Sequence, residues 1–189
     1  NNYRNQVAMV DAHPVFFSGT IEENLRFIRP NISDRELEEA LHLSGFSRML
    51  KDFLDGLSTE INQFGAPLSE GNRTALSVAR SLIKQPRILL FDETLASLDK
   101  LSKVWLLEKL DEIARGRTLI MATHDLQFVT NFDSIIVLES GNLSGQGTHS
   151  ELLENCIPYN DLWELDRSLS RIGMTGENEA TMGNPPNAG

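Results

Sequence analysis

The stretch RILLFDET, residues 87–94, lies in the middle of the chain and sets the expected fold. Four consecutive apolar residues, Ile88 to Phe91, follow Pro86, and such a run is typical of a parallel strand buried on both faces. Asp92 and Glu93 come next, at the strand's carboxyl end, where open parallel α/β sheets bind their ligands. Paired carboxylates there suit metal binding or general-base chemistry. The simpler alternative is that they cap the following helix.

Two further segments extend this sheet. TLIMATHDL predicts a buried strand over residues 119–122, with Thr123 and His124 emerging at its end. A histidine at the edge that already carries two carboxylates is more often functional than structural. Residues 6–10 predict another strand, and SIIVLESGNLSGQGTHSELL predicts strand, turn, strand and helix. This alternation of strands and helices places the chain in the α/β class.

Helix start signals organise the rest of the chain. Thr20 with Glu23, and Ser33 with Glu36, form two capping boxes, and a third helix is expected at about residues 47–54. We therefore expect a small helical subdomain between strands. A longer helix is expected to begin at Ser69, with apolar residues at helical spacing, namely Ala75, Leu76, Ala79, Leu82 and Ile83.

The first turn of this longer helix contains Ser69, Gly71 and Asn72. A hydroxyl, an uncovered backbone and an amide at a helix N-terminus can attract an anion. An ordinary serine N-cap is the alternative.

Composition narrows the function classes. The chain has 189 residues and a net charge of −10, which argues against nucleic-acid binding. Its single cysteine, Cys156, excludes an internal disulfide framework and suits a buried inert thiol. No apolar run approaches the roughly 20 residues of a membrane span. The opening NNYRNQVAMV does not begin with Met and enters a strand almost at once, so we expect that upstream sequence is missing. The other end of the chain is polar, and we expect it to be disordered.

Six segments in order resemble a known family. FFSGTIEENL, STEINQFG, LSEGNRTALSVARSLI, RILLFDETLASLD, TLIMATHDL and SIIVLESGNLSGQGTHSELL resemble the nucleotide-binding domain of ABC transporters, particularly the exporter type, over roughly residues 5–165. The resemblance implies an α/β fold: a P-loop NTPase (RecA-like) core with an inserted helical subdomain, the N-terminal part of the sheet missing. It divides the chain into a coupling (Q-loop) region at 1–19, a helical subdomain at 20–68, the signature helix and ATPase core at 69–170, and a disordered tail at 171–189.

The resemblance also implies roles for individual residues. Asp92 would hold Mg²⁺ through water, Glu93 would be the general base for the attacking water, and His124 would contact the γ-phosphate of ATP. The remaining matches are ATP-binding residues that act across a dimer interface, Ser69, Gly71, Asn72 and Asp99, and residues of two loops that face the membrane domains, Ala12 and Glu60.

The implied assembly is a dimer of nucleotide-binding domains joined to transmembrane domains, at the cytoplasmic face of a membrane. In it ATP binding closes the dimer and hydrolysis releases it.

Three departures from the family qualify these expectations. No GxxxxGK[ST] loop occurs, so we expect the chain alone to bind ATP poorly or not at all. Ala12 stands where the family has glutamine, so its contact with the membrane domains is expected to be altered. The signature reads LSEGN instead of LSGGQ, and the carboxylate of Glu70 would repel the partner's γ-phosphate, so we expect that composite site to be slow or silent.

Two alternatives to an exporter ATPase remain. One is a degenerate, non-hydrolysing partner domain of a heterodimeric transporter, which Ala12 and LSEGN favour and the intact Asp92, Glu93 and His124 oppose. The other is a soluble ABC ATPase that acts on DNA or the ribosome, which the acidic composition and the exporter-like segments disfavour. The transported substrate is not encoded in these residues.

Overall fold

The computed structural model describes residues 3–11, 13–94 and 98–179, with side chains described up to residue 168. The chain forms two units, residues 1–124 and 125–189, which are described separately below.

The first unit is built on a three-stranded parallel sheet in the order β1 (Val7–Val10), β4 (Ile88–Asp92) and β5 (Thr118–Ala122). Val10 lies opposite Phe91, and Asp92 lies opposite Ala122. The three strands therefore end at one edge, and Asp11, Glu93 and Thr123 are the residues that follow them. This confirms the expected strands at the centre of the chain.

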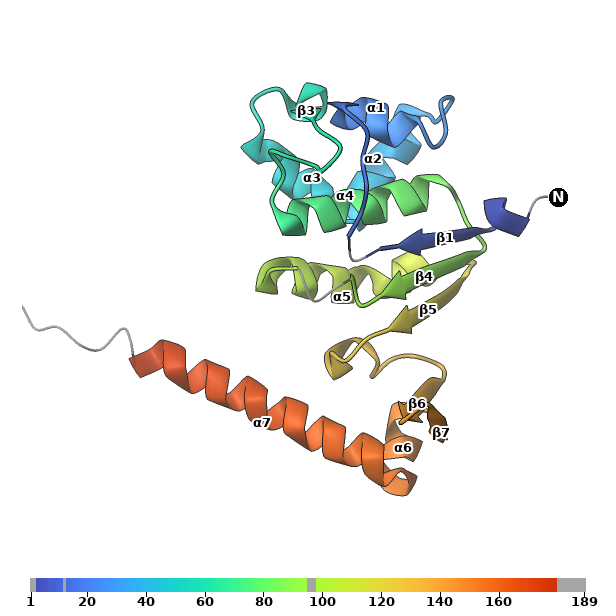
Figure 1. Ribbon diagram of the computed structural model, residues 1–189, viewed down its shortest axis with the longest axis vertical. Coiled ribbons are helices and arrows are strands. Elements are labelled where there is room, and N and C mark those ends of the chain that lie inside the picture. Colours follow the sequence, from blue (N-terminus) through green and yellow to red (C-terminus); the bar gives the residue numbers. More distant parts are fainter. Residues whose placement is uncertain (1–2, 12, 95–97, 180–189) are drawn as a thin grey trace, which may run out of the picture. The chain divides into compact units, whose positions relative to one another are not determined.

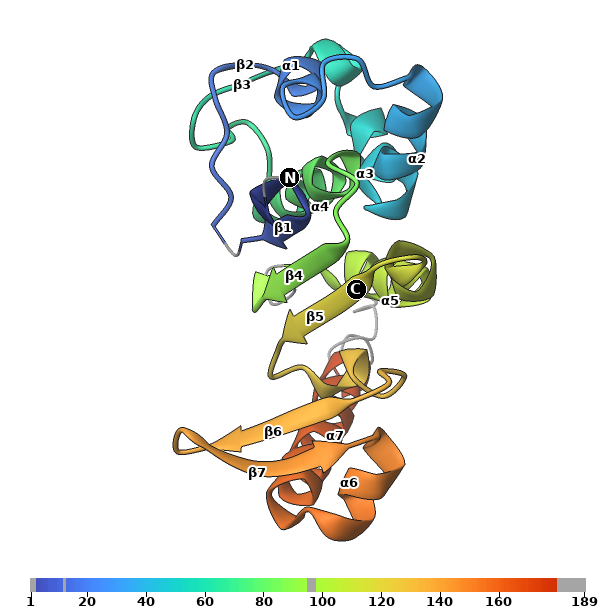
Figure 2. The same cartoon turned by 90° about the vertical axis from the view of Figure 1, so that its right-hand side faces the viewer.

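Two helices cover one face of this sheet. α4 (Glu70–Ile83) links β1 to β4 and α5 (Lys100–Ala114) links β4 to β5; both lie on the same side of the strands (Figures 1 and 2). Right-handed crossovers between strands added in one direction produce this arrangement. Leu89 and Phe91 are buried against the helices.

The opposite face of the sheet differs from expectation. Met9 and Ile120 on that face are each about half exposed, at 50% and 52%. Leu90, the residue of the central strand that pairs with both, is only partly buried. The expectation that the central strand is buried on both faces is therefore not met on this face, because within the described residues both crossover helices lie on the other side.

A helical subdomain is inserted between β1 and α4. Its elements are β2 (Gly19–Thr20), α1 (Ile21–Arg26), α2 (Asp34–Leu43), α3 (Phe46–Met49) and β3 (Glu60–Ile61), with short 3-10 helices at Leu50–Asp52 and Gly56–Ser58. Both capping boxes form as expected: the side chains of Thr20 and Ser33 accept from the N3 amides of their helices, and Glu23 and Glu36 bond back. The antiparallel pair β2–β3 was not anticipated.

The third helix of the subdomain is shorter than expected. α3 makes one turn, begins after Gly45 and passes into a 3-10 helix that ends at Asp52. Phe46 is fully buried, whereas Leu54 is fully exposed. Beyond the 3-10 helix the backbone turns to an extended conformation at Phe53, which ends the helical segment before Leu54.

The second unit joins a hairpin to two helices. β6 (Ile135–Glu139) pairs antiparallel with β7 (Asn142–Gly147), and α6 (His149–Asn155) and α7 (Ile157–Glu179) follow. A short 3-10 helix, Leu126–Phe128, precedes the hairpin. The core contains Leu126, Val129, Val137, Leu152, Tyr159 and the buried thiol of Cys156.

The helix α7 continues to Glu179, into the stretch for which disorder is predicted, and residues 180–189 lie outside the described part. No proline interrupts the chain between Pro158 and Pro185, so the helix of the preceding turns can propagate. Among the described helices, none combines the length and the apolar character needed to cross a membrane.

Candidate functional site

The carboxyl edge of the parallel sheet brings three expected site residues together. Asp92 ends β4, Glu93 follows it, and His124 lies two residues beyond the end of β5. The Oε1 atom of Glu93 lies 4.0 Å from Nδ1 of His124, and the two side chains are 65% and 73% exposed. A carboxylate and an imidazole are thus side by side and open to a ligand from solvent.

The backbone at Glu93 adopts an unusual conformation. Its φ of +46° lies in the left-handed region, which costs a non-glycine residue of order 1–3 kcal/mol. Its amide donates to the carbonyl of Ala122 on the neighbouring strand at 2.9 Å. Such strain persists where surrounding contacts hold it, and it often marks a functional turn.

Thr94 completes this turn and was not singled out from the sequence. Its side chain is buried, and Oγ1 donates to the carbonyl of Val10, at the end of β1, over 2.7 Å. No local pattern identifies the residue, because its partner lies 84 positions away.

The N-terminus of α4 holds a second group of expected site residues. Ser69 is the N-cap, and its hydroxyl accepts from the amide of Asn72 at 3.2 Å. Gly71 lies between them in the first turn. The N-cap alternative is therefore correct as local structure, and the first-turn amides remain at an end of the helix that attracts anions.

Asp99 caps α5 in a similar way. Its Oδ1 accepts from the amides of Leu101 and Ser102 at 3.0 Å each, and its Oδ2 accepts from the Ser102 hydroxyl at 2.6 Å. These bonds, above all those from the Ser102 hydroxyl and amide, hold the pKa of Asp99 below its usual value. Asp99 is therefore an ionised cap at neutral pH.

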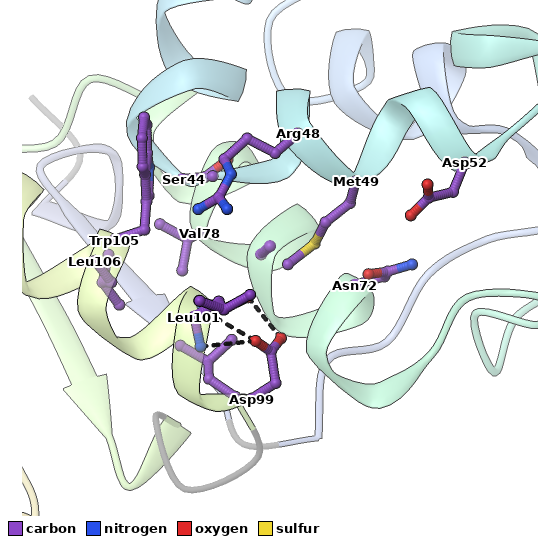
Figure 3. A pocket seen from close by; sticks show the side chains of 14 residues that line it. Ser44, Arg48, Met49, Asp52, Asn72, Val78, Asp99, Leu101, Trp105 and Leu106 are labelled. Carbon is purple, nitrogen blue, oxygen red and sulfur yellow. Dashed lines mark hydrogen bonds between the residues drawn. The ribbon is translucent and has the colours of Figure 1, made fainter.

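Asn72 and Asp99 line one cavity of about 300 Å³ between α3, α4 and α5 (Figure 3). Arg48 and Trp105 line the same cavity, with the guanidinium 5.0 Å from the ring centroid. Two residues expected to face ATP of a second subunit are thus brought together, beside an arginine that the sequence analysis did not identify.

The expected coupling segments meet around another cavity. Ala12 itself lies outside the described residues. Its neighbours His13 to Val15 line a cavity of about 350 Å³ with Gln63 and Phe64 of STEINQFG and with Glu70. Glu60 lies on β3, paired with Thr20, and does not line this cavity.

Arg80 on α4 anchors the first of these segments. Its Nη1 donates to the carbonyl of Val15 at 2.7 Å, and its guanidinium lies 5.3 Å from the Phe16 ring centroid. Burial lowers the pKa of Arg80. Arg80 was also missed from the sequence, because its partner is 65 positions away.

The donor set at the sheet edge fits a magnesium ion only in part. Within residues 3–11, 13–94 and 98–179, no three His, Cys, Asp or Glu side chains cluster closely enough to hold a metal by themselves. Carboxylate oxygens are nevertheless the ligands that Mg²⁺ prefers, and it commonly takes only one or two from protein, with water and phosphate supplying the others. Asp92 fits that role.

Comparison with known proteins identifies the family. Residues 1–96 match the family model described as ABC transporter. The chain is 36% identical over 160 residues to ABC transporter B family member 3 of Dictyostelium discoideum, which covers 85% of the chain and 11% of that protein. It is 39% identical over 150 residues to YknV of Bacillus subtilis, an uncharacterised ABC transporter ATP-binding protein, covering 79% of the chain and 25% of YknV.

A solved structure shows the same fold. A bacterial Atm1-family ABC exporter with ATP bound matches with a TM-score of 0.81 at 30% identity, over 87% of this chain and 29% of that one. The chain thus spans between 11% and 29% of the length of these relatives. The family match, the relatives and the shared fold agree: the chain belongs to the ABC transporter family and carries the fold of an exporter-type nucleotide-binding domain.

Proposed function

We propose that the chain is part of the ATP-hydrolysing domain of an exporter-type ABC transporter and drives a substrate across a membrane. The observation that carries this proposal is the sheet edge, where Glu93 lies 4.0 Å from His124 and directly follows Asp92. Phosphoryl transfer depends mainly on positioning and on charge stabilisation, which such an edge can provide.

Each residue has a part in this proposal. Glu93 accepts a proton from the water that attacks the γ-phosphate, and His124 donates a hydrogen bond to a γ-phosphate oxygen. Asp92 would hold Mg²⁺ through water, and the ion would supply positive charge to offset the negative charge of the phosphates.

Other residues of the chain act on a second nucleotide-binding domain. Ser69, Gly71 and Asn72 bind the γ-phosphate of ATP held by the partner, and Asp99 lies in the loop that crosses to it. Support comes from the capped N-terminus of α4 and from the cavity that Asn72 and Asp99 share. The chain contains no GxxxxGK[ST] loop, so the activity is that of an assembly that supplies one.

Transmembrane domains are the remaining partners. Ala12 and Glu60 belong to the loops that contact them, at the cytoplasmic face of the membrane. The clustering of residues 13–15 with Gln63 and Phe64 supports this assignment, because two segments distant in sequence form one surface. Substrate choice then resides in the membrane domains.

The test is a Glu93→Gln substitution in the purified transporter that contains this chain. The amide keeps the shape of the side chain but cannot take up a proton, so ATP turnover should fall by at least a hundredfold while ATP still binds. Glu154→Gln, an exposed carboxylate on α6, is the matched control and should leave turnover unchanged. Unchanged turnover in Glu93→Gln would mean that this chain is the degenerate partner of a heterodimer.

A further inference from the structure

Three strand ends meet at the sheet edge, and a single buried hydroxyl joins two of them. The Oγ1 of Thr94 lies 2.7 Å from the carbonyl oxygen of Val10 and 3.1 Å from that of Asp92. A hydroxyl has one hydrogen to donate, so the shorter contact, to Val10, takes the main bond. Thr94 itself is only 1% exposed.

The positions of these groups give the bond its significance. Thr94 directly follows Glu93, and Val10 is the last residue of β1, two positions before Ala12. The bond therefore ties the turn that carries the proposed general base to the start of the proposed coupling loop. Glu93 is held from the other side as well, since its amide donates to the carbonyl of Ala122, just before Thr123 and His124.

The strained backbone explains why two such anchors are needed. With φ at +46°, Glu93 would relax toward a commoner conformation if the turn were released. The Ala122 bond fixes the amide of Glu93 but leaves the chain after it free to rotate. The buried Thr94 hydroxyl fixes that following residue, and so the two bonds together determine where the carboxylate lies.

We infer that Thr94 is a positioning residue that holds the Glu93 turn against the end of β1 and so links the hydrolytic site to the segment leading to the membrane domains. This inference rests on the proposed function. Thr94 touches neither water nor phosphate in this role. Its contribution is to fix the conformation of Glu93 and the position of the Glu93 turn relative to residue 11 and the loop that follows.

The test compares Thr94→Val with Thr94→Ser in the purified transporter. Valine has the same shape as threonine without the donor, whereas serine keeps the hydroxyl. Thr94→Val should lower kcat roughly tenfold with the KM for ATP within about twofold, because small misplacements of a reacting group cost this much or more. Thr94→Ser should retain at least half of the wild-type kcat.

Amide hydrogen exchange provides a readout independent of turnover. In Thr94→Val, peptides covering residues 8–19 and 88–94 should exchange faster, while peptides of α2 and of the β6–β7 hairpin keep their protection. Thr130→Val is the matched control, since it removes a hydroxyl whose contact to the Gln127 carbonyl is exposed and 3.5 Å long. It should change neither exchange near Glu93 nor turnover.

Three outcomes separate the possibilities. If Thr94→Val has the kcat and the amide exchange of the wild type, the inference is overturned. If Glu93→Gln, measured alongside, has lost ATP turnover, the proposed function still stands. A general loss of protection with a lower unfolding temperature, and no rescue by serine, would also overturn it, because it would mark a residue needed only for folding. If Glu93→Gln hydrolyses ATP normally, the proposed function fails, and coordinated faster exchange at both loops would still establish the physical link.

Discussion

Gly45 precedes α3 and lies beside Trp105 of α5. Its replacement by alanine should lower the free energy of unfolding for two separable reasons. Its φ is +78°, and alanine in this left-handed region costs about 1–2 kcal/mol. A Cβ added there would lie 3.0 Å from Cδ1 of Trp105, so the indole has to move. That movement strains the bond from Trp105 Nε1 to the carbonyl of His42, worth about 1 kcal/mol.

A smaller effect opposes these losses. Alanine restricts the unfolded chain and thereby returns about 0.4–1 kcal/mol. We therefore expect Gly45→Ala to lower the free energy of unfolding by about 2 kcal/mol in total. Gly116→Ala is the matched control, because φ there is +74° but nothing lies within 4 Å of the added carbon. It should lose only about 1 kcal/mol, from backbone strain.

Tryptophan fluorescence can follow this unfolding directly. The chain has two tryptophans, Trp105 in the first unit and Trp163 in the second, so a Trp163→Phe background leaves Trp105 as the only reporter. Urea titrations of both glycine variants in this background give the two losses. Equal losses in the two variants would refute the argument that Trp105 packs on Gly45, and no loss in either would refute the strain argument.

Three further predictions follow from other contacts. Arg80→Met removes the 2.7 Å bond to the Val15 carbonyl and should lower the free energy of unfolding by about 1–2 kcal/mol, with faster amide exchange at residues 13–17; unaltered exchange there would contradict the anchoring role. Bonds from the Ser33 hydroxyl and amide, and from Arg29, lower the pKa of Glu36 to about 2, so Glu36 stabilises the fold above the ordinary carboxyl pKa and loses this effect as pH falls from about 5 to 2. The difference in unfolding temperature between wild type and Glu36→Gln should shrink over that range, and a constant difference would argue against the bonds. Glu70→Gly should raise ATP turnover of the composite site, since a carboxylate ~7 Å from a phosphate costs about 2 kcal/mol per charge at an effective dielectric near 20; unchanged turnover would show that LSEGN is as competent as LSGGQ.

Local sequence determined most of the helices and strands and the positions of the expected site residues along the chain. The capping boxes at Thr20 and Ser33 and the helix that begins after Ser69 depend on residues at most four positions apart, and the structure confirms them. The strand that leads to Asp92 was also predictable, because an apolar run and the turn residues beside it are neighbours in the sequence. The roles of Asp92, Glu93, His124, Ser69, Gly71, Asn72, Asp99, Ala12 and Glu60 remain predictions.

Only the tertiary structure decided how these elements are held together. The left-handed turn at Glu93, the bond from Thr94 to Val10 across 84 positions, and the anchoring of Val15 by Arg80 across 65 have no local signature. The exposed face of the sheet with Met9 and Ile120 was likewise invisible in a run of apolar letters. A hydrogen bond within one turn is specified by neighbouring residues, whereas a long-range bond or a covered face exists only after distant segments have packed.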